Sequence, residues 1–247
     1  MRGPAEQFAA EDSGVSLGRQ PLPDALVGER PPLFVGILPA DYAAISASAR
    51  VRVFTRGEML YLKGDAVQQV VLVTSGFVKV TQLGVSGSEV ILRLGVPGDV
   101  LGAAGLLSTG KHSTTAQAFR FCRALIWDAR AFKLLAERFP VLHRNMARIL
   151  GEDLLELEER FQEVATERVA PRVARQLVRL RDKIGHRVNG DVEIGLSRED
   201  LAQMTGTTLF TVSRLLSAWE ASGIVKPSRE AVTICDVQSL RSMSEDQ

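Results

Sequence analysis

The chain has 247 residues, enough for one or two domains with a sizeable core. Its 45% hydrophobic and 24% charged residues are typical of a globular protein, and the net charge of +1 excludes global basicity as a sign of nucleic-acid binding. Cys122 and Cys235 form neither a disulfide framework nor a C-x-x-C metal pair. No apolar run of about 18 residues and no signal-peptide core occurs, so we expect a cytoplasmic protein without membrane contact.

The first third of the chain changes from a disordered to a β-rich composition. Residues 1–33 are rich in glycine, proline, serine and acidic residues, which predicts a mostly disordered arm. A short helix is expected over 39–49. Short β-type runs separated by glycine-bearing turns follow at 51–54, 59–62, 70–73, 77–82, 90–94 and 118–127. This spacing predicts a β-sandwich, jelly roll or barrel over residues 34–137.

A glycine-rich bend at 98–107 ends the β-rich region and leads into a possible short helical turn. Backbone N–H groups of such a bend can cradle a phosphate. Ordinary turn geometry is the alternative, and the sequence leaves both open.

A short helix is expected over 128–136 and a long one over 138–167. Apolar residues repeat along the long helix with spacings of four and three: Leu150, Leu154, Leu157, Phe161 and Val164. Such a period predicts pairing with a like helix, hence a homodimer; packing on its own domain is the alternative. The residues around this seam are acidic, with Arg160 as the one base among them: Glu152, Asp153, Glu156, Glu158, Glu159 and Glu163. We expect a DNA backbone to repel this surface.

The charge reverses in residues 168–187, which hold seven basic residues against Asp182 alone. Pro171 lacks an N–H and clashes with a preceding helical carbonyl, so the helix is expected to break just before it. This places a hinge near 166–169 and starts a third domain, residues 168–247. The basic helix beyond the hinge can meet phosphates or present a solvated face.

Residues 196–223 read as two short helices joined by a tight turn. Ser197 and Asp200 have the spacing of a capping box, and Gly206 stands where the chain turns. Thr207 or Thr208 can cap the second helix, whose inner face has apolar residues at helical spacing. Its outer face begins with residues that a helix-turn-helix places against base edges: Thr207, Thr208, Leu209, Phe210, Ser213 and Arg214.

A strand expected at 192–196 and a hairpin at 224–234 flank this unit and complete a winged helix. Lys226 and Arg229 would lie near the wing tip, where phosphate contacts usually fall. We therefore expect an α+β protein with a cyclic-nucleotide-binding-like β-roll, a long dimerisation helix and a C-terminal winged helix-turn-helix.

The order of these elements, the G-D-V-L-G at 98–102 and the L-S-R-E-D-L-A-Q-M-T-G-T-T-L-F-T-V-S-R at 196–214 resemble the Crp/Fnr family of bacterial transcription regulators. The resemblance covers residues 34–243. It implies a homodimer that binds a near-palindromic promoter site on double-stranded DNA and works with RNA polymerase. It also implies that an effector in the β-roll reorients the recognition helices. Ser197 would join the DNA-contacting residues.

The resemblance further implies an effector pocket formed by Gly102, Ala103, Gly105, Leu106, His112, Ser113 and Leu157. Cyclic-AMP-binding members carry Glu, an Arg-Ser pair and Thr-Ser where this chain has Ala103, His112-Ser113 and Leu157-Glu158. Losing a buried charged contact weakens ligand binding strongly, so we expect no useful binding of cyclic AMP.

Other cofactors and activities find little support. Two cysteines cannot supply the four thiolates of an iron–sulfur cluster, whereas His112 is the best-placed axial ligand for haem, an alternative that stays open. A cupin-type metal enzyme needs two or three clustered histidines, and the three present are widely spaced, so we expect no catalytic residues and no metal site. A constitutive regulator with a filled pocket is a further alternative.

The recognition helix also departs from the family. Phe210 stands where members place a glutamate that binds cytosine, whereas Ser213-Arg214 match the Ser-Arg pair of the Fnr branch. Arg214 is the predicted guanine contact. Leu209 and Phe210 could pack on thymine methyl groups or on the first helix of the motif.

Overall fold

The computed structural model describes residues 30–85 and 87–245, and its N-terminal half contains two antiparallel four-stranded sheets. The first sheet has the order β1 (Arg50–Phe54), β8 (Cys122–Asp128), β3 (Gln69–Ser75) and β6 (Val100–Leu101). The second has the order β2 (Met59–Tyr61), β7 (Thr115–Ala118), β4 (Val78–Leu83) and β5 (Glu89–Gly95). Valine, alanine and leucine side chains of both sheets share one buried core, as in a jelly roll.

Edge strand β1 of the first sheet is exposed except at Phe54, whereas the central strands β8 and β3 are largely buried on both faces, because helices cover the outer side of the sheet. These are η2 (Pro32–Phe34), α1 (Pro39–Ala47), α3 (Ala129–Arg138) and the start of α4 (Pro140–Thr166). Trp127 of β8 lies in this outer core and donates its indole N–H to the Ile45 carbonyl at 3.0 Å. The short α2 (Ala103–Leu107) follows β6.

Three details of the N-terminal expectations need correction. The run at 118–127 is two strands separated by a turn, and β6 was missed because it has only two residues. Residues 30–33, which the sequence placed in the disordered arm, are ordered: Leu33 is buried and its carbonyl accepts a hydrogen bond from Asn145 at 2.8 Å. The rest of that arm, 1–29, lies outside the described residues.

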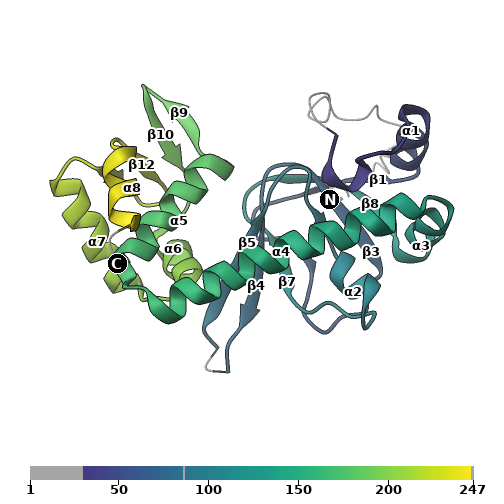
Figure 1. Cartoon of the computed structure of the whole chain (residues 1–247), viewed down its shortest axis with the longest axis horizontal. Helices are drawn as coiled ribbons and strands as arrows, with labels where there is room; N and C mark the ends of the chain where they lie inside the picture. The colour runs from purple at the N-terminus through teal and green to yellow at the C-terminus, as the bar shows by residue number, and fades with distance from the viewer. Residues whose placement is uncertain (1–29, 86, 246–247) are drawn as a thin grey trace, which may run out of the picture.

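Helix α4 crosses the molecule and joins its two halves (Figure 1). It has 27 residues, a length of about 40 Å, and begins with Pro140, whose missing N–H needs no partner there. It ends at Thr166; Glu167 and Arg168 are extended, and α5 (Val169–Ile184) starts next. The break thus falls where the sequence predicted it, just before Pro171.

The C-terminal half is a winged helix-turn-helix. After α5 come β9 (His186–Val188), β10 (Asp191–Ile194), α6 (Arg198–Thr205), α7 (Leu209–Ala221), β11 (Val225–Pro227), β12 (Val232–Ile234) and α8 (Val237–Glu245). The strands form one sheet of order β11-β12-β10-β9. The basic stretch at 168–187 is helical only to Ile184 and continues as β9, because the asparagine and glycine at 189–190 favour a hairpin.

The two halves share a continuous buried core. Ile91 and Leu94 of β5 and Phe119 pack in one cluster with Leu201 and Met204 of α6. The first helix of the helix-turn-helix therefore lies against the β-roll of its own chain. None of the helices in the described ranges combines the length and apolar composition that crossing a bilayer requires.

Candidate nucleic-acid interface and ligand cavity

The helix-turn-helix forms through the local signals found in the sequence. The Ser197 hydroxyl accepts the Asp200 N–H, and the Asp200 carboxylate accepts the Ser197 N–H, both at 3.0 Å, which completes the capping box. Gly206 has φ +59°, a left-handed conformation that costs glycine little. Thr208 caps α7 by accepting the Thr211 N–H at 3.2 Å. Each signal fixes one end of a helix, so the turn is set locally.

Helix α7 has one buried and one exposed face. Val212, Leu216 and Trp219 are buried against the rest of the domain. Leu209 is 48% and Phe210 78% exposed, so both present apolar surface to solvent. The exposed positions at the start of this helix are those that read base edges in other helix-turn-helix proteins.

The remaining predicted DNA contacts lie around this exposed end. Arg214 is exposed and forms no ion pair with any described residue, whereas Thr207 and Ser213 are partly exposed. The Ser197 hydroxyl donates to the Asp200 carboxylate at 2.6 Å, so the capping box already occupies it. Arg214 is thus the basic residue of α7 whose side chain is available to bind DNA.

The wing carries the other two basic residues that were predicted to contact DNA. Arg229 lies exposed in the turn between β11 and β12, and Lys226 on β11 is 3.6 Å from the carboxylate of Asp191. Next to them, Glu230 binds the guanidinium of Arg56 from the β-roll through two bonds of 2.9 and 3.0 Å. The wing tip therefore contacts the β-roll through Glu230 and also presents the exposed Arg229 side chain to solvent.

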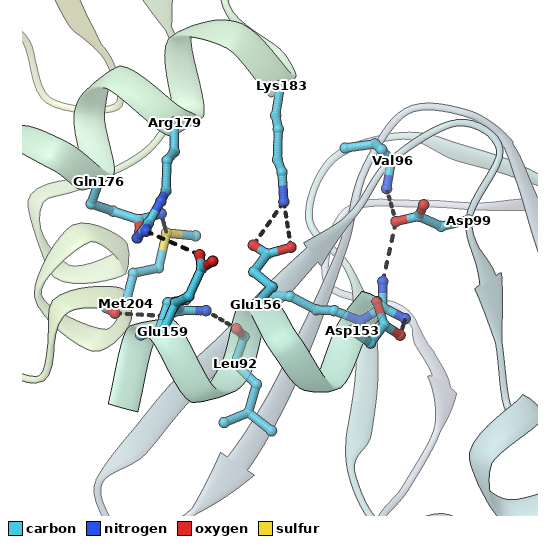
Figure 2. A network of polar contacts seen from close by, with 12 residues as sticks. Leu92, Val96, Asp99, Asp153, Glu156, Glu159, Gln176, Arg179, Lys183 and Met204 are labelled. Carbon is cyan, nitrogen blue, oxygen red and sulfur yellow. Dashed lines mark hydrogen bonds and ion pairs between the residues drawn. The ribbon is translucent and has the colours of Figure 1, made fainter. Parts of the chain in front are cut away.

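The sequence left open whether the basic side chains of α5 meet phosphates or form a solvated face; most of them do neither, because they pair with acidic residues of the same chain. Arg175 pairs with Glu167 at 2.5 Å, Arg179 with Glu163 at 2.5 Å and Lys183 with Glu156 at 2.8 Å. Figure 2 shows Lys183 and Arg179 reaching from α5 toward the acidic side of α4. The acidic and basic runs of the sequence neutralise one another after the chain folds back at 167–168.

Arg172 lies on the buried side of α5, so it too is not part of a solvated basic face. It is buried and donates its Nε–H to the Thr205 carbonyl at 2.7 Å, which ties α5 to the end of α6. Arg168 and Arg187 are the bases of this stretch that stay exposed without a described ion pair. Exposed basic side chains without a described ion pair therefore remain only at the two ends of the stretch.

The predicted seam of α4 is largely unpaired within the chain. Leu154, Leu157, Phe161 and Val164 are exposed, with Phe161 at 73%, while Leu150 is half-buried. Their own chain therefore leaves most of this surface uncovered, although Leu154 and Leu157 also line the cavity described below. A contiguous apolar stripe of this kind marks an interaction surface.

A cavity of about 240 Å³ lies between the β-roll and α4. Gly102, Ala103, Ser113 and Leu157 line it as predicted. Residues that the sequence did not suggest complete its lining: Tyr61, Val80, Leu92, Arg93, Val100, Ala104, Thr114, Leu150, Asp153, Leu154, Glu156 and Arg160.

Three predicted pocket residues do not line the cavity: Gly105, Leu106 and His112. His112 is 6% exposed and stacks on the Tyr61 ring, with centroids 3.7 Å apart and planes 6° from parallel. Burial lowers its pKa, which favours the neutral imidazole, with Asp65 opposing the shift. Tyr61 thus separates His112 from the cavity. Gly105 is required by close packing, since a Cβ there would lie 2.4 Å from the Lys111 carbonyl oxygen.

The charged lining residues are mostly paired. Arg93 binds Asp99 at 3.1 Å and Asp153 at 3.3 Å, and burial raises the pKa of Asp153 against the attraction of Arg93. Figure 2 shows Asp99 receiving the Val96 N–H beside this pair. Arg160 donates instead to carbonyl oxygens of β5 and α6. The one signal for Arg160 in the sequence was its position as the lone base among acids.

Comparison with known proteins matches both halves of the chain. The model of the Crp-like helix-turn-helix domain matches residues 171–243 and that of the cyclic nucleotide-binding domain residues 51–139. Among the described residues, no group of histidine, cysteine and acidic side chains could hold a metal ion.

Similar proteins span nearly the whole chain. The cyclic AMP receptor protein of Thermus thermophilus is 28% identical over 86% of this chain and 96% of its own. A CRP-like cAMP-activated global transcriptional regulator of Mycobacterium tuberculosis is 24% identical over 84% and 94%. The structure of FixK2 from Bradyrhizobium japonicum has a TM-score of 0.70 at 23% identity and covers 81% of this chain and 98% of its own. The chain belongs to the Crp/Fnr family of transcription regulators, with a helix-turn-helix DNA-binding domain.

Proposed function

We propose that this regulator acts in the cytoplasm as a homodimer, binds a near-palindromic promoter site with its two α7 helices, and works with RNA polymerase under the control of an effector other than cyclic AMP. The observation that carries the proposal is the exposed, unpartnered end of α7, where Phe210 and Arg214 face solvent. Similar regulators are named as transcription activators or regulators, which supports the same role here.

The exposed stripe on α4 supports the dimer. Phe161 and Val164 lie near the end of α4 that adjoins the DNA-binding half, so pairing of two α4 helices would bring two recognition helices together. A two-fold dimer reads two half-sites related by the same symmetry, which is why the site is expected to be near-palindromic.

The side chains of α7 suggest how a half-site is read. An arginine binds guanine O6 and N7 through two hydrogen bonds, and Arg214 is exposed and free to do so. Leu209 and Phe210 are apolar and exposed, which supports contact with thymine methyl groups. Arg229 on the wing, and Lys226 beside it, would bind phosphates and position the module.

The cavity supports an effector over the constitutive alternative, because its 240 Å³ are not filled by side chains. Its residues do not suit cyclic AMP: Ala103 cannot accept ribose hydroxyls, His112 is stacked behind Tyr61, and Leu157 offers no polar atom to adenine. No observation favours haem, since His112 does not reach the cavity.

Selection of binding sites from a random DNA library tests this proposal. We expect a two-fold symmetric site with one guanine per half-site. Arg214→Ala should lose about 1–3 kcal/mol of discrimination at that guanine. Arg229→Ala is the matched control, and it should weaken all sites alike and reduce the salt dependence by about one unit. Enrichment of no sequence by the wild type would reject the proposal.

Calorimetry with cyclic AMP tests the effector part. We expect no heat of binding at concentrations up to about a millimolar, the range in which weak ligands are detected. Micromolar binding would contradict it.

A further inference from the structure

The ligand cavity adjoins the contact between the β-roll and the DNA-binding half. A smaller cleft of about 20 Å³ lies next to it and is lined by residues of α5 and α6, among them Arg179, Lys183 and Met204. Arg93, Glu156 and Arg160 line both spaces. A molecule in the cavity therefore meets side chains that also hold the DNA-binding half in place.

Arg160 is the one of these three that bonds to the helix-turn-helix itself. Its guanidinium donates to the carbonyls of Ile91, at 3.2 Å, and Leu92 on β5. It also donates to the carbonyl of Met204 in the last turn of α6, at 2.7 Å. One side chain of α4 thus connects the wall of the cavity to the first helix of the DNA-binding motif.

The charges of the cavity are balanced except at Arg160. Arg93 is paired with Asp99 and Asp153, and Glu156 with Lys183. No ion pair among the described residues includes Arg160, whose hydrogen-bond partners are neutral carbonyl oxygens; burial lowers its pKa against the longer-range attraction of Glu156 and Glu163. A guanidinium binds a carboxylate or phosphate more strongly than a neutral acceptor, because both partners are then charged and the bonds can be bidentate. An anionic group entering the cavity would find Arg160 as the cation without an anionic partner.

We propose that Arg160 selects an effector with a carboxylate or phosphate group, and that binding of this group draws the guanidinium away from the Met204 carbonyl and loosens the docking of α6. The apolar part of the effector would lie against the leucines and valines of the lining, such as Val80, Leu92 and Leu154. This inference rests on the proposed function, since it assigns the chemistry of the effector and its route to the DNA-binding domain.

Loosening α6 changes the orientation of the domain without detaching it. Lys79 of β4 still pairs with Asp200 of α6 at 3.3 Å, and Arg56 still binds Glu230 of the wing. The anion therefore shifts an equilibrium between two arrangements of α6 against β5. Helix α7 moves with α6, because the two helices share a buried core.

Tethered charges test the inference without knowledge of the effector. Ser113 lines the cavity and is exposed, so Ser113→Cys offers an attachment point. Cys235→Ser removes the partly exposed native thiol, whereas buried Cys122, its pKa raised to about 11, stays unreactive. The thiol receives either a sulfonatoethyl or a trimethylammonioethyl methanethiosulfonate adduct, which are similar in size and opposite in charge. Amide hydrogen exchange of the α6 and β5 peptides in the full chain reports docking.

The anionic adduct is expected to accelerate exchange in α6 about tenfold relative to the cationic one, while exchange in β3 stays unchanged. In an Arg160→Gln background the difference between the two adducts should vanish. Equal effects of both adducts, or a difference that persists without Arg160, would overturn the inference. Ala104→Cys, a second exposed lining position, repeats the test if Ser113→Cys folds poorly.

Binding of the selected DNA site is measured on the same samples. If amide exchange in α6 is the same with both adducts while the protein still binds the selected DNA site, the role of Arg160 is overturned and the proposed function stands. Absence of specific DNA binding by the unmodified chain would overturn the proposed function itself.

Discussion

The carboxylate of Glu163 on α4 binds the guanidinium of Arg179 on α5 at 2.5 Å, and Glu163 is 8% exposed. Arg175 lies 3.5 Å from the same carboxylate and also binds Glu167. These contacts span the two-residue break between the helices. They hold the DNA-binding half at a defined angle to the long helix.

Glu163→Ala should destabilise the protein by about 2–3 kcal/mol, because it leaves two partly buried arginines without their shared carboxylate. The expected loss of unfolding free energy is smaller than for a fully buried ion pair, since both arginine side chains keep contact with water. Urea unfolding followed by circular dichroism measures it. Glu159→Ala is the matched control: Glu159 is 3.9 Å from Arg179 and 71% exposed, so its loss should matter little. Equal effects of the two substitutions would contradict the role of Glu163.

The sequence predicted the elements of the fold well where local signals decide them. The capping box at Ser197, the left-handed Gly206 and the break before Pro171 each depend on a few adjacent residues, and the structure confirms all three. The exposed seam around Phe161 could also be predicted, because its period is a property of one helix.

The partners of charged residues could not be predicted in the same way. Acidic α4 and basic α5 were each interpreted alone, as a surface that repels DNA and a surface that meets it. They neutralise one another because the chain folds back between them, which a linear pattern does not show. Arg160 and Tyr61 were missed as cavity residues for the same reason: α4 meets β2 and β5 only in the folded chain.

Phe161→Asp should convert the protein to a monomer, because it places a charge in the apolar seam of α4. Sedimentation velocity measures the change, and binding to a two-half-site DNA should fall with it. Leu155→Asp is the matched control, since Leu155 is an equally exposed apolar residue of α4 that lies outside the seam. A dimer that survives Phe161→Asp but not Leu155→Asp would place the interface on another face of the helix.

Phe210→Ala should weaken the recognition of thymine methyl groups, which Phe210 shares with Leu209. Replacing thymines of the selected half-site by deoxyuridine should weaken wild-type binding by about 0.8 kcal/mol for each buried methyl group. Phe210→Ala should reduce this difference, with Leu209 keeping its own methyl contact, whereas Arg214→Ala should keep the difference in full. Fluorescence anisotropy at fixed salt gives the affinities of the three proteins for the two DNAs. A variant without Phe210 that keeps the full wild-type difference between thymine and uracil would exclude this contact.

His112→Gln should make the stability of the protein less sensitive to acid. The pKa of His112 is lowered by burial against Tyr61, with nearby Asp65 opposing the shift. A lowered folded-state pKa means that the unfolded chain binds the proton more readily, so the stabilisation is present above the unfolded pKa of about 6.5 and is lost as the pH falls below it. Urea unfolding at about pH 7 and about pH 5 should show a larger loss of unfolding free energy in the wild type than in the variant. Both proteins share all other titrating groups, so an equal loss would show that His112 is solvated and charged in the folded state.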